Sequence, residues 1–180
     1  MRVVAGELGG RRLAAPPRGA EVRPTADRVR EALFSIIGPV EGAKVLDLFS
    51  GTGALAIEAL SRGASEATLV DTHTALARRN VGDLGLADRA RIVRGDALRF
   101  LRRTRRRFDL IFCDPPYRLA DRLGEDLDQL IPGRLAEGGR LIVESAARRP
   151  LELSLPLLAD RRYGDTVVRV YAAKARAADG

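Results

Sequence analysis

The sequence has very few of the residues from which disulfide frameworks and zinc sites are built. Its 180 residues include one cysteine, one histidine and no tryptophan. A single cysteine excludes an internal disulfide and a cysteine-based metal site. No apolar run approaches the roughly 20 residues that span a bilayer, and the first residues do not form a secretory signal. We therefore expect a cytoplasmic protein without a membrane segment and without a bound metal.

Lysine is almost absent too, since Lys44 and Lys174 are the only lysines among 31 basic residues. The net charge is nevertheless +7, with a sequence pI of about 10.6. The planar guanidinium of arginine pairs bidentately with phosphates and with guanine edges, so this balance favours a nucleic acid as partner. A genome biased toward arginine and alanine codons would give the same excess, so charge alone does not decide the partner.

The chain length suits one domain with a small appendage. Residues 1–24 read as an N-terminal β-hairpin and linker, and residues 25–180 as the main domain. The hairpin would pair Arg2–Ala5 with Arg11–Ala14, and the linker over 15–24 is rich in proline. After Thr25, a good helix N-cap, an amphipathic helix is expected to end at Gly38-Pro39.

From Lys44 onward, strand and helix patterns alternate. Such alternation predicts right-handed βαβ units in an α/β, doubly wound, mostly parallel sheet. Ligands bind such sheets beyond the carboxyl ends of the strands. The expected strands are Lys44–Phe49, Glu66–Val70, Ala90–Arg94, Phe108–Cys113 and Arg140–Val143, with a closing hairpin of Leu158–Arg162 and Thr166–Ala173. The expected helices are Ala54–Ser61, Thr74–Leu84, Leu98–Arg103 and Asp121–Ile131.

The first strand runs into a glycine turn that could cradle a ligand. Gly51 and Gly53 permit a tight turn and let a ligand approach the backbone and the following helix. The same spacing also fits a dinucleotide fingerprint, or a turn that only packs helix on strand. Asp47 argues against a dinucleotide because its charge would repel a pyrophosphate, whereas it could attract the cationic amino-acid portion of S-adenosylmethionine.

Two further acids follow the second and third strands. Asp71 stands where nucleoside-binding folds place an acid that accepts hydrogen bonds from ribose hydroxyls. Asp96 could accept from an adenine amino group while the Ala97 N–H meets a ring nitrogen. Each acid alone is more simply a helix N-cap. Together with Asp47 they predict a nucleoside site without phosphates.

The fourth strand ends in Asp114-Pro115-Pro116-Tyr117. The two prolines fix an extended turn that leaves the Asp114 and Pro115 carbonyls without helical partners. A carboxylate and a carbonyl that accept from an aromatic amine localise its lone pair and stabilise the charge that develops on methylation. Tyr117 would stack on a base flipped out of its helix. This tetrapeptide predicts methyl transfer to an amine of a nucleic-acid base.

These residues resemble the class I amino methyltransferases. Residues 23–34, Arg-Pro-Thr-Ala-Asp-Arg-Val-Arg-Glu-Ala-Leu-Phe, and 47–55, Asp-Leu-Phe-Ser-Gly-Thr-Gly-Ala-Leu, are similar to the RsmD-type family of 16S ribosomal RNA guanine-N2 methyltransferases. The resemblance covers nearly the whole chain and implies a seven-stranded Rossmann-like sheet whose last strand is antiparallel. It implies a monomer that uses S-adenosyl-L-methionine on the small subunit or an assembly intermediate. The implied cofactor residues are Asp47, Ser50, Gly51, Gly53, Asp71, Asp96 and Ala97, and the implied base-binding residues are Asp114–Tyr117.

One position departs from the family pattern, which usually has an acid two residues after Asp71. Here that residue is His73, and we expect no loss of activity from the change. The densest basic run, residues 102–107, enters the fourth strand at the edge opposite the site and is expected to be a solvated loop. Arginines expected at the catalytic edge, or implied by resemblance, are Arg11, Arg12, Arg28, Arg30, Arg118, Arg122, Arg148 and Arg149.

Other functions remain open from the sequence. A DNA adenine-N6 methyltransferase shares the tetrapeptide but usually adds a target-recognition region. An RNA-binding module that has lost catalysis would keep the fold, although the intact Asp114–Tyr117 turn argues against it. A dinucleotide oxidoreductase would need a second, substrate-binding domain.

Overall fold

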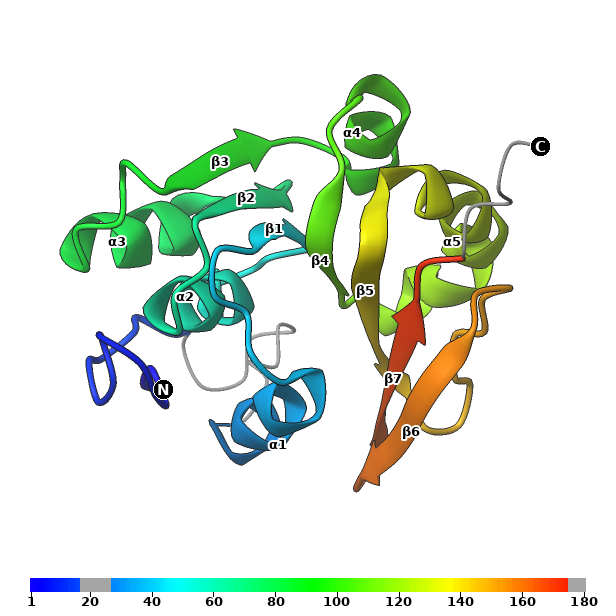
Figure 1. The fold of residues 1–180 in the computed structure, drawn as a ribbon, viewed down its shortest axis with the longest axis horizontal. Helices are drawn as coiled ribbons and strands as arrows, with labels where there is room; N and C mark the ends of the chain where they lie inside the picture. The colour runs from blue at the N-terminus through cyan, green and yellow to red at the C-terminus, as the bar shows by residue number, and fades with distance from the viewer. Residues whose placement is uncertain (17–26, 175–180) are drawn as a thin grey trace.

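The computed structural model describes residues 1–16 and 27–174, except for the side chains of residues 117–122. Most of the proline-rich linker therefore lies outside the described residues, as does Thr25. The described chain builds one seven-stranded sheet between helices (Figure 1). This architecture is the α/β, doubly wound sheet that the alternating pattern predicted.

The strand order, β3-β2-β1-β4-β5-β7-β6, has the first strand near the middle. The first five strands along the chain are mutually parallel. The central strands β1 and β4 are almost entirely buried because helices cover both faces of the sheet. The last strand, β7, inserts antiparallel between β5 and β6, which confirms the predicted closing hairpin. The strands are β1 Lys44–Leu48, β2 Glu66–Asp71, β3 Ala90–Arg94, β4 Phe108–Cys113, β5 Leu135–Ala146, β6 Leu157–Tyr163 and β7 Thr166–Ala172.

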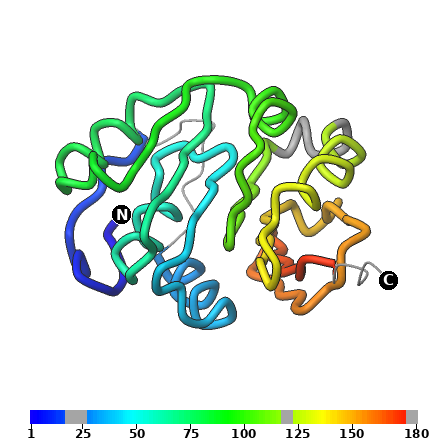
Figure 2. The backbone as a smooth tube through the Cα atoms, turned by 45° about the horizontal axis from the view of Figure 1, so that its top comes forward, coloured from blue at the N-terminus to red at the C-terminus, as the bar shows by residue number. Residues whose placement is uncertain are grey.

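The helices form two layers with separate apolar cores. The helices α1 Asp27–Ile37, α2 Ala54–Ser61 and α3 Ala75–Asp83 cover one face, where Phe34 packs against Phe112 of β4. The helices α4 Ala97–Arg103 and α5 Tyr117–Leu130 cover the other face, and the short 3-10 turn η1 Pro132–Arg134 leads into β5 (Figure 2). No helix in the described ranges is long and apolar enough to cross a bilayer.

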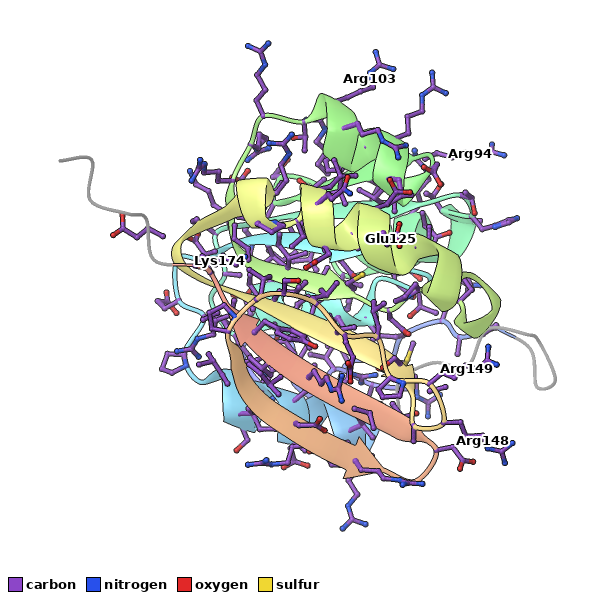
Figure 3. The ribbon with its side chains drawn as sticks, turned by 90° about the vertical axis from the view of Figure 1, so that its right-hand side faces the viewer. Arg94, Arg103, Glu125, Arg148, Arg149 and Lys174 are labelled. Carbon is purple, nitrogen blue, oxygen red and sulfur yellow. The ribbon has the colours of Figure 1, made fainter. Side chains whose placement is uncertain are left out.

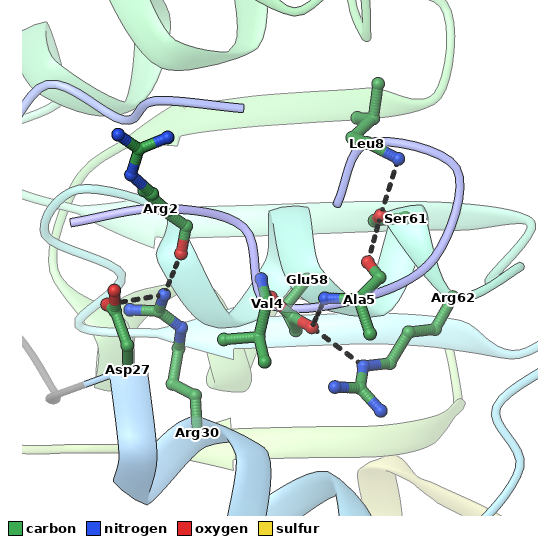
Figure 4. Close-up of polar contacts among 9 residues, drawn as sticks. All are labelled: Arg2, Val4, Ala5, Leu8, Asp27, Arg30, Glu58, Ser61 and Arg62. Atoms are coloured by element: carbon green, nitrogen blue, oxygen red, sulfur yellow. Dashed lines mark hydrogen bonds and ion pairs between the residues drawn. The ribbon is translucent and has the colours of Figure 1, made fainter. Parts of the chain in front are cut away.

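The predicted hairpin is much smaller than expected. A single antiparallel bridge joins Arg2 to Arg12, in place of two four-residue strands. Hydrogen bonds from Val3 N–H to the Arg11 carbonyl and from Leu13 N–H to the Met1 carbonyl flank this bridge, and other N–H groups of the segment donate to α2 instead. The buried Glu58 carboxylate accepts from the N–H groups of Val4 and Ala5 at 2.7 and 3.0 Å, and the Ser61 hydroxyl accepts from that of Leu8 at 3.0 Å (Figure 4).

The largest shifts in element boundaries are at the starts of β5 and α5, which begin five and four residues earlier than predicted. Strand β5 begins at Leu135 rather than Arg140, because Leu135 already pairs with Phe108 of β4, ahead of an irregular stretch in which Gly138 has a left-handed φ of 69°. Helix α5 begins at Tyr117 rather than Asp121, with Pro116 in extended backbone at its N-cap. Proline is compatible with a helix start because the first N–H groups have no intrahelical partner. The Pro-Pro turn therefore leads directly into α5.

Candidate active site

The strand order brings the predicted acids to one edge of the sheet. Parallel strands share a carboxyl edge, and across it the order is Asp96 after β3, Asp71 ending β2, the glycine turn after β1 and Asp114 after β4. After β1 the chain builds β2 and β3 on one side of β1, and it then returns to place β4 on the other side. A doubly wound sheet binds its ligand at such a switch point. The proposed cofactor residues lie on the β1–β3 side, and the Asp-Pro-Pro turn lies on the β4 side.

The glycine turn is built from left-handed backbone. Gly51 and Gly53 have φ of 51° and 77°, and Phe49, at φ 61°, is the one non-glycine residue of the described chain with positive φ. A Cβ on Gly53 would lie 2.7 Å from Cδ2 of Leu69. A non-glycine residue in this conformation is strained, and such strain gathers at binding sites. The turn therefore needs glycine at position 53 for both conformation and space.

Asp71 ties the second strand to this turn. Its carboxylate accepts from the N–H of Gly51 at 2.8 Å and, through the other oxygen, from the N–H of His73 at 2.8 Å. The side chain is partly exposed, so the carboxylate also faces the solvent at the carboxyl edge. His73 is exposed, as expected for a surface residue near a helix start.

Asp47 lies beneath the turn rather than at its surface. The side chain is buried, and its carboxylate accepts from the N–H of Ala56 in the first turn of α2 at 3.2 Å. Burial raises the pKa of Asp47 to about 7, against a lowering effect of the Ala56 hydrogen bond and with a further rise from the charge of Asp71. Asp47 thus supports the helix that follows the turn and holds a carboxylate whose charge depends on pH near neutrality.

Ser50 provides an independent sign that the turn receives a ligand. Its hydroxyl is buried and has no hydrogen-bond partner among the described residues. Buried hydroxyls are normally paired, because an unpaired one loses its hydrogen bonds to water without replacement. A polar ligand bound against residues 50–53 would supply the missing partner. This turn therefore fits a ligand that presents a polar group to Ser50.

Asp96 acts as a helix cap, the simpler of the two roles that the sequence allowed. Its side chain accepts from the N–H of Arg99 at 2.8 Å at the start of α4. One carboxylate oxygen makes this bond, and the residue is exposed at the carboxyl edge. The backbone of Ala97 follows directly, with its methyl group buried. Capping fixes the position of Asp96, and a contact with a cofactor remains a prediction.

Asp114 is held at the end of β4 in an environment that favours its neutral form. Burial raises its pKa well above the usual value, and the nearby charges of Glu144 and Asp47 raise it further. Pro115 is buried and Pro116 exposed, so the turn is anchored on one side. The backbone of Tyr117 begins α5, but its side chain, like those of Arg118 and Arg122, lies outside the described residues.

The arginines predicted to meet RNA fall into different environments. Arg148 and Arg149 are exposed on the turn after β5, at the carboxyl edge and far from Lys174 (Figure 3). Arg28 is exposed on α1, and Arg11 and Arg12 are exposed on the N-terminal segment.

The prediction for Arg30 is wrong. Arg30 is fully buried, pairs with Asp27 at 3.0 Å and donates to the backbone carbonyl of Arg2 (Figure 4). Its charge therefore holds α1 to the N-terminal segment, and it does not face a partner. Spacing on the helix could not reveal this interaction, because it depends on a residue 28 positions away in the sequence.

The basic run of residues 102–107 lies where chain direction predicted, at the amino edge. Arg106 pairs with Glu66, the first residue of β2, and stacks its guanidinium 5.8 Å from the ring centre of Phe108. Arg102 pairs with Asp126 of α5 at 2.6 Å. Part of this charge is therefore neutralised within the protein.

Two further residues, to which the motifs assigned no role, contact or neighbour the proposed site at the carboxyl edge. Glu144, near the end of β5, lines one hollow with Asp114. Asn80, buried on α3, links the N-terminal segment to the glycine turn: it bonds the N–H and C=O of Ala14 and the C=O of Thr52 at 2.7 to 3.1 Å. An acid directly after the apolar stretch of the fifth strand was a signal for Glu144. The role of Asn80 depends on an interaction between distant segments.

Fold and site together define a class I methyltransferase, and known proteins agree. The crystal-structure neighbour from Salinibacter ruber, an RNA methyltransferase in complex with S-adenosyl-L-homocysteine, shares the fold with a TM-score of 0.66 at 15% identity over 88% of this chain and 98% of that chain. A solved Thermus thermophilus structure, the hypothetical protein TTHA0928, has a TM-score of 0.80 at 30% identity over 95% of this chain and 98% of that chain.

The family follows from sequence similarity. A family model described as Conserved hypothetical protein 95 matches residues 1–172. The Ribosomal RNA small subunit methyltransferase D of Escherichia coli K12 is 38% identical over 156 residues, which cover 84% of this chain and 77% of that protein. The chain belongs to this RsmD-type methyltransferase family, which confirms the resemblance carried by its motifs.

Proposed function

We propose that this protein transfers a methyl group from S-adenosyl-L-methionine to the exocyclic N2 amine of a guanine in 16S ribosomal RNA. The observation that carries the proposal is the position of the Asp114 turn beside the glycine turn, on either side of the β1/β4 switch point. Membership of the RsmD-type family supports methylation of small-subunit ribosomal RNA. We infer that the chain acts as a monomer on the small subunit or on an assembly intermediate.

Five groups would hold the cofactor. Asp71 would accept from the ribose hydroxyls, and Asp96 with the Ala97 N–H would bind the adenine. Asp47, together with the unpartnered Ser50 hydroxyl, would favour the cationic amino-acid end over the glycine turn. When bound, S-adenosyl-L-methionine supplies an electrophilic methyl group whose bond to sulfur breaks with the electron pair remaining on sulfur.

The protein's own residues would make the amine a better nucleophile. Asp114 and the Pro115 carbonyl would accept the two N–H groups of the amine, which localises the nitrogen lone pair as it forms the new N–C bond. Tyr117 would stack on the flipped guanine. No catalytic base is needed, because the methylated amine carries a positive charge and loses one proton readily to water.

A product analysis tests this function. The protein is incubated with methyl-labelled S-adenosylmethionine and, in parallel, with naked 16S RNA, small subunits and duplex DNA, and the products are digested to nucleosides for mass spectrometry. The proposal expects N2-methylguanosine from the ribosomal substrates. N6-methyladenine from the DNA, or labelled protein without labelled RNA, would contradict it.

A further inference from the structure

A second carboxylate stands next to the one that the proposed mechanism uses. Strands β4 and β5 are parallel, and Cys113 pairs with Val143 in their register. The next residues, Asp114 and Glu144, therefore lie side by side, one residue further toward the carboxyl edge of the sheet. Both are partly buried, and both line the same hollow, together with apolar residues of five elements. The apolar lining residues are Leu33, Leu55, Phe112, Ile142 and Val168, with Cys113 completing the set.

Asp114 and Glu144 also interact electrostatically. After burial, the charge of Glu144 is the next largest cause that raises the pKa of Asp114. Each carboxylate accepts hydrogen bonds, so two carboxylates side by side match a ligand edge with two adjacent N–H donors. The pair is therefore suited to a base that offers one donor to each carboxylate.

Among the bases that carry an exocyclic amine, only guanine has that edge. The guanine N2 amine stands beside the N1–H group, which is a donor. The adenine N6 amine is flanked by N1 and N7, which are both acceptors, and the cytosine N4 amine stands beside N3, also an acceptor. A second carboxylate beside the amine would bind the N1–H of guanine and would face a lone pair in adenine or cytosine.

We propose that Glu144 accepts a hydrogen bond from the N1–H of the target guanine while Asp114 accepts from its N2 amine. Glu144 is then the residue that selects guanine from the other amine-bearing bases. This inference rests on the proposed function, since it places the same base in the same site. A carboxylate placed to accept from N1–H discriminates against a base that presents a lone pair at that position, because two hydrogen-bond acceptors then face each other.

A substrate analogue, compared between the wild type and a Glu144 variant, tests this hydrogen bond. 2-Aminopurine keeps the amine at position 2 but lacks O6 and presents an acceptor at N1 where guanine has N1–H. The experiment places 2-aminopurine or guanine at the nucleotide that the wild-type protein methylates, in otherwise identical RNA. It then compares kcat/KM for the two substrates in the wild type, in Glu144→Gln and in Glu137→Gln. Glu137 is an exposed residue at the opposite end of the same strand and serves as the matched control.

The inference expects the wild type and Glu137→Gln to prefer guanine by roughly 10²-fold, the scale of one well-formed base contact. In Glu144→Gln the preference should fall by about tenfold or more, because the glutamine amide can donate to N1 of 2-aminopurine. If Glu144→Gln lowers kcat/KM equally for the guanine and the 2-aminopurine substrate, the ratio of the two values is unchanged and Glu144 has only a structural role. A wild type that methylates both bases equally well overturns the inference even if Glu144→Gln fails to fold.

The two levels of failure can be told apart by the product of the wild type. If no N2-methylguanine forms from natural RNA, the proposed function is wrong and the role of Glu144 is wrong with it. If N2-methylguanine forms but the ratio of the two substrates does not depend on Glu144, only the specificity assignment is wrong. A cofactor affinity of Glu144→Gln equal to that of the wild type shows that the variant is folded in this comparison.

Discussion

The Asp71 carboxylate accepts a hydrogen bond from the backbone N–H of Gly51 at 2.8 Å, and this bond joins the end of β2 to the glycine turn after β1. The other carboxylate oxygen accepts from the N–H of His73 at 2.8 Å. One side chain thus fixes two loops of the proposed cofactor site relative to each other.

Asp71→Ala should weaken the binding of S-adenosyl-L-homocysteine by about 10- to 100-fold. This is the scale of losing hydrogen bonds to a charged acceptor. The effect would combine the missing ribose hydrogen bonds with a freer turn. Calorimetry gives the affinity. Asp83→Ala, an exposed residue paired only at the surface with Arg79, is the control and should bind like the wild type. Equal affinities of the two variants for S-adenosyl-L-homocysteine would show that Asp71 does not contribute to cofactor binding.

The two roles of Asp96 can be separated by the choice of substitution. Serine is a good N-cap, so Asp96→Ser should keep the stability of the wild type, whereas Asp96→Ala should lose about 1 kcal/mol. Both should lose roughly 1–3 kcal/mol of cofactor binding, because neither has the carboxylate oxygen left for the adenine. Urea unfolding and calorimetry measure the two quantities. Full affinity in Asp96→Ser would leave Asp96 as a cap and nothing more.

Asp47 should make the stability of the protein fall as pH rises. Its pKa is about 7 in the folded protein against a usual value of 3.8, so the folded state holds its proton longer than the unfolded chain. Stability is therefore lost between about pH 4 and pH 7, by up to about 4 kcal/mol from this group. Asp47→Asn should remove that pH dependence, so it should be more stable than the wild type at pH 8. An identical pH dependence in Asp47→Asn would show that another group is responsible.

The same residue should act in the opposite direction on cofactor affinity. The ammonium group of the ligand is favoured by the ionised carboxylate, so the affinity of the wild type for S-adenosyl-L-homocysteine should rise about tenfold from pH 6 to pH 8. Asp47→Asn should bind more weakly, with a flatter pH profile. Asp47 would then illustrate stability given up for function, as is common at binding sites. A variant that gains stability and keeps the full affinity would contradict the assignment.

The RNA surface is predicted to lie at the carboxyl edge despite the denser charge elsewhere. Neutralising Arg148 and Arg149 together should weaken RNA binding. It should also flatten the plot of log affinity against log salt by roughly 0.7–0.9 for each phosphate that the protein no longer neutralises. Neutralising residues 105–107 should change both far less, partly because Arg106 already pairs with Glu66. A larger effect in the 105–107 variant would place the RNA on the amino edge.

The sequence predicted local elements well where one periodicity is uninterrupted. The helix Ala54–Ser61 and the strand Phe108–Cys113 agree with the structure residue for residue, because glycines or a proline mark their ends. The sequence also predicted that the acids at the strand ends lie along one edge of the sheet, because parallel strands share one carboxyl edge. These features depend on neighbours in the chain and on general rules of sheet topology.

Interactions between distant segments could not be predicted in this way. The N-terminal hairpin is reduced to one bridge, and Glu58 and Ser61 of α2 accept from the N–H groups of Val4 and Leu8 in the same segment. Arg30 is buried because its guanidinium reaches the carbonyl of Arg2. Asp47 was predicted to attract the cationic end of the cofactor, and its burial beneath the turn was not visible in the sequence. In each case a tertiary partner, invisible in local spacing, decides where the side chain lies.

The most direct test of the central claim is the single-turnover methylation rate of Asp114→Ala on the ribosomal substrate of the wild type. The account predicts a rate lower by about 10²–10³, the scale of losing one preorganised hydrogen-bonding group at a reacting centre. The affinity for S-adenosyl-L-homocysteine should stay near that of the wild type. The control, Asp88→Ala in the exposed loop before β3, should keep both values. Wild-type turnover in Asp114→Ala would contradict amine activation by the strand-end carboxylate, and with it the assignment of this edge as the active site.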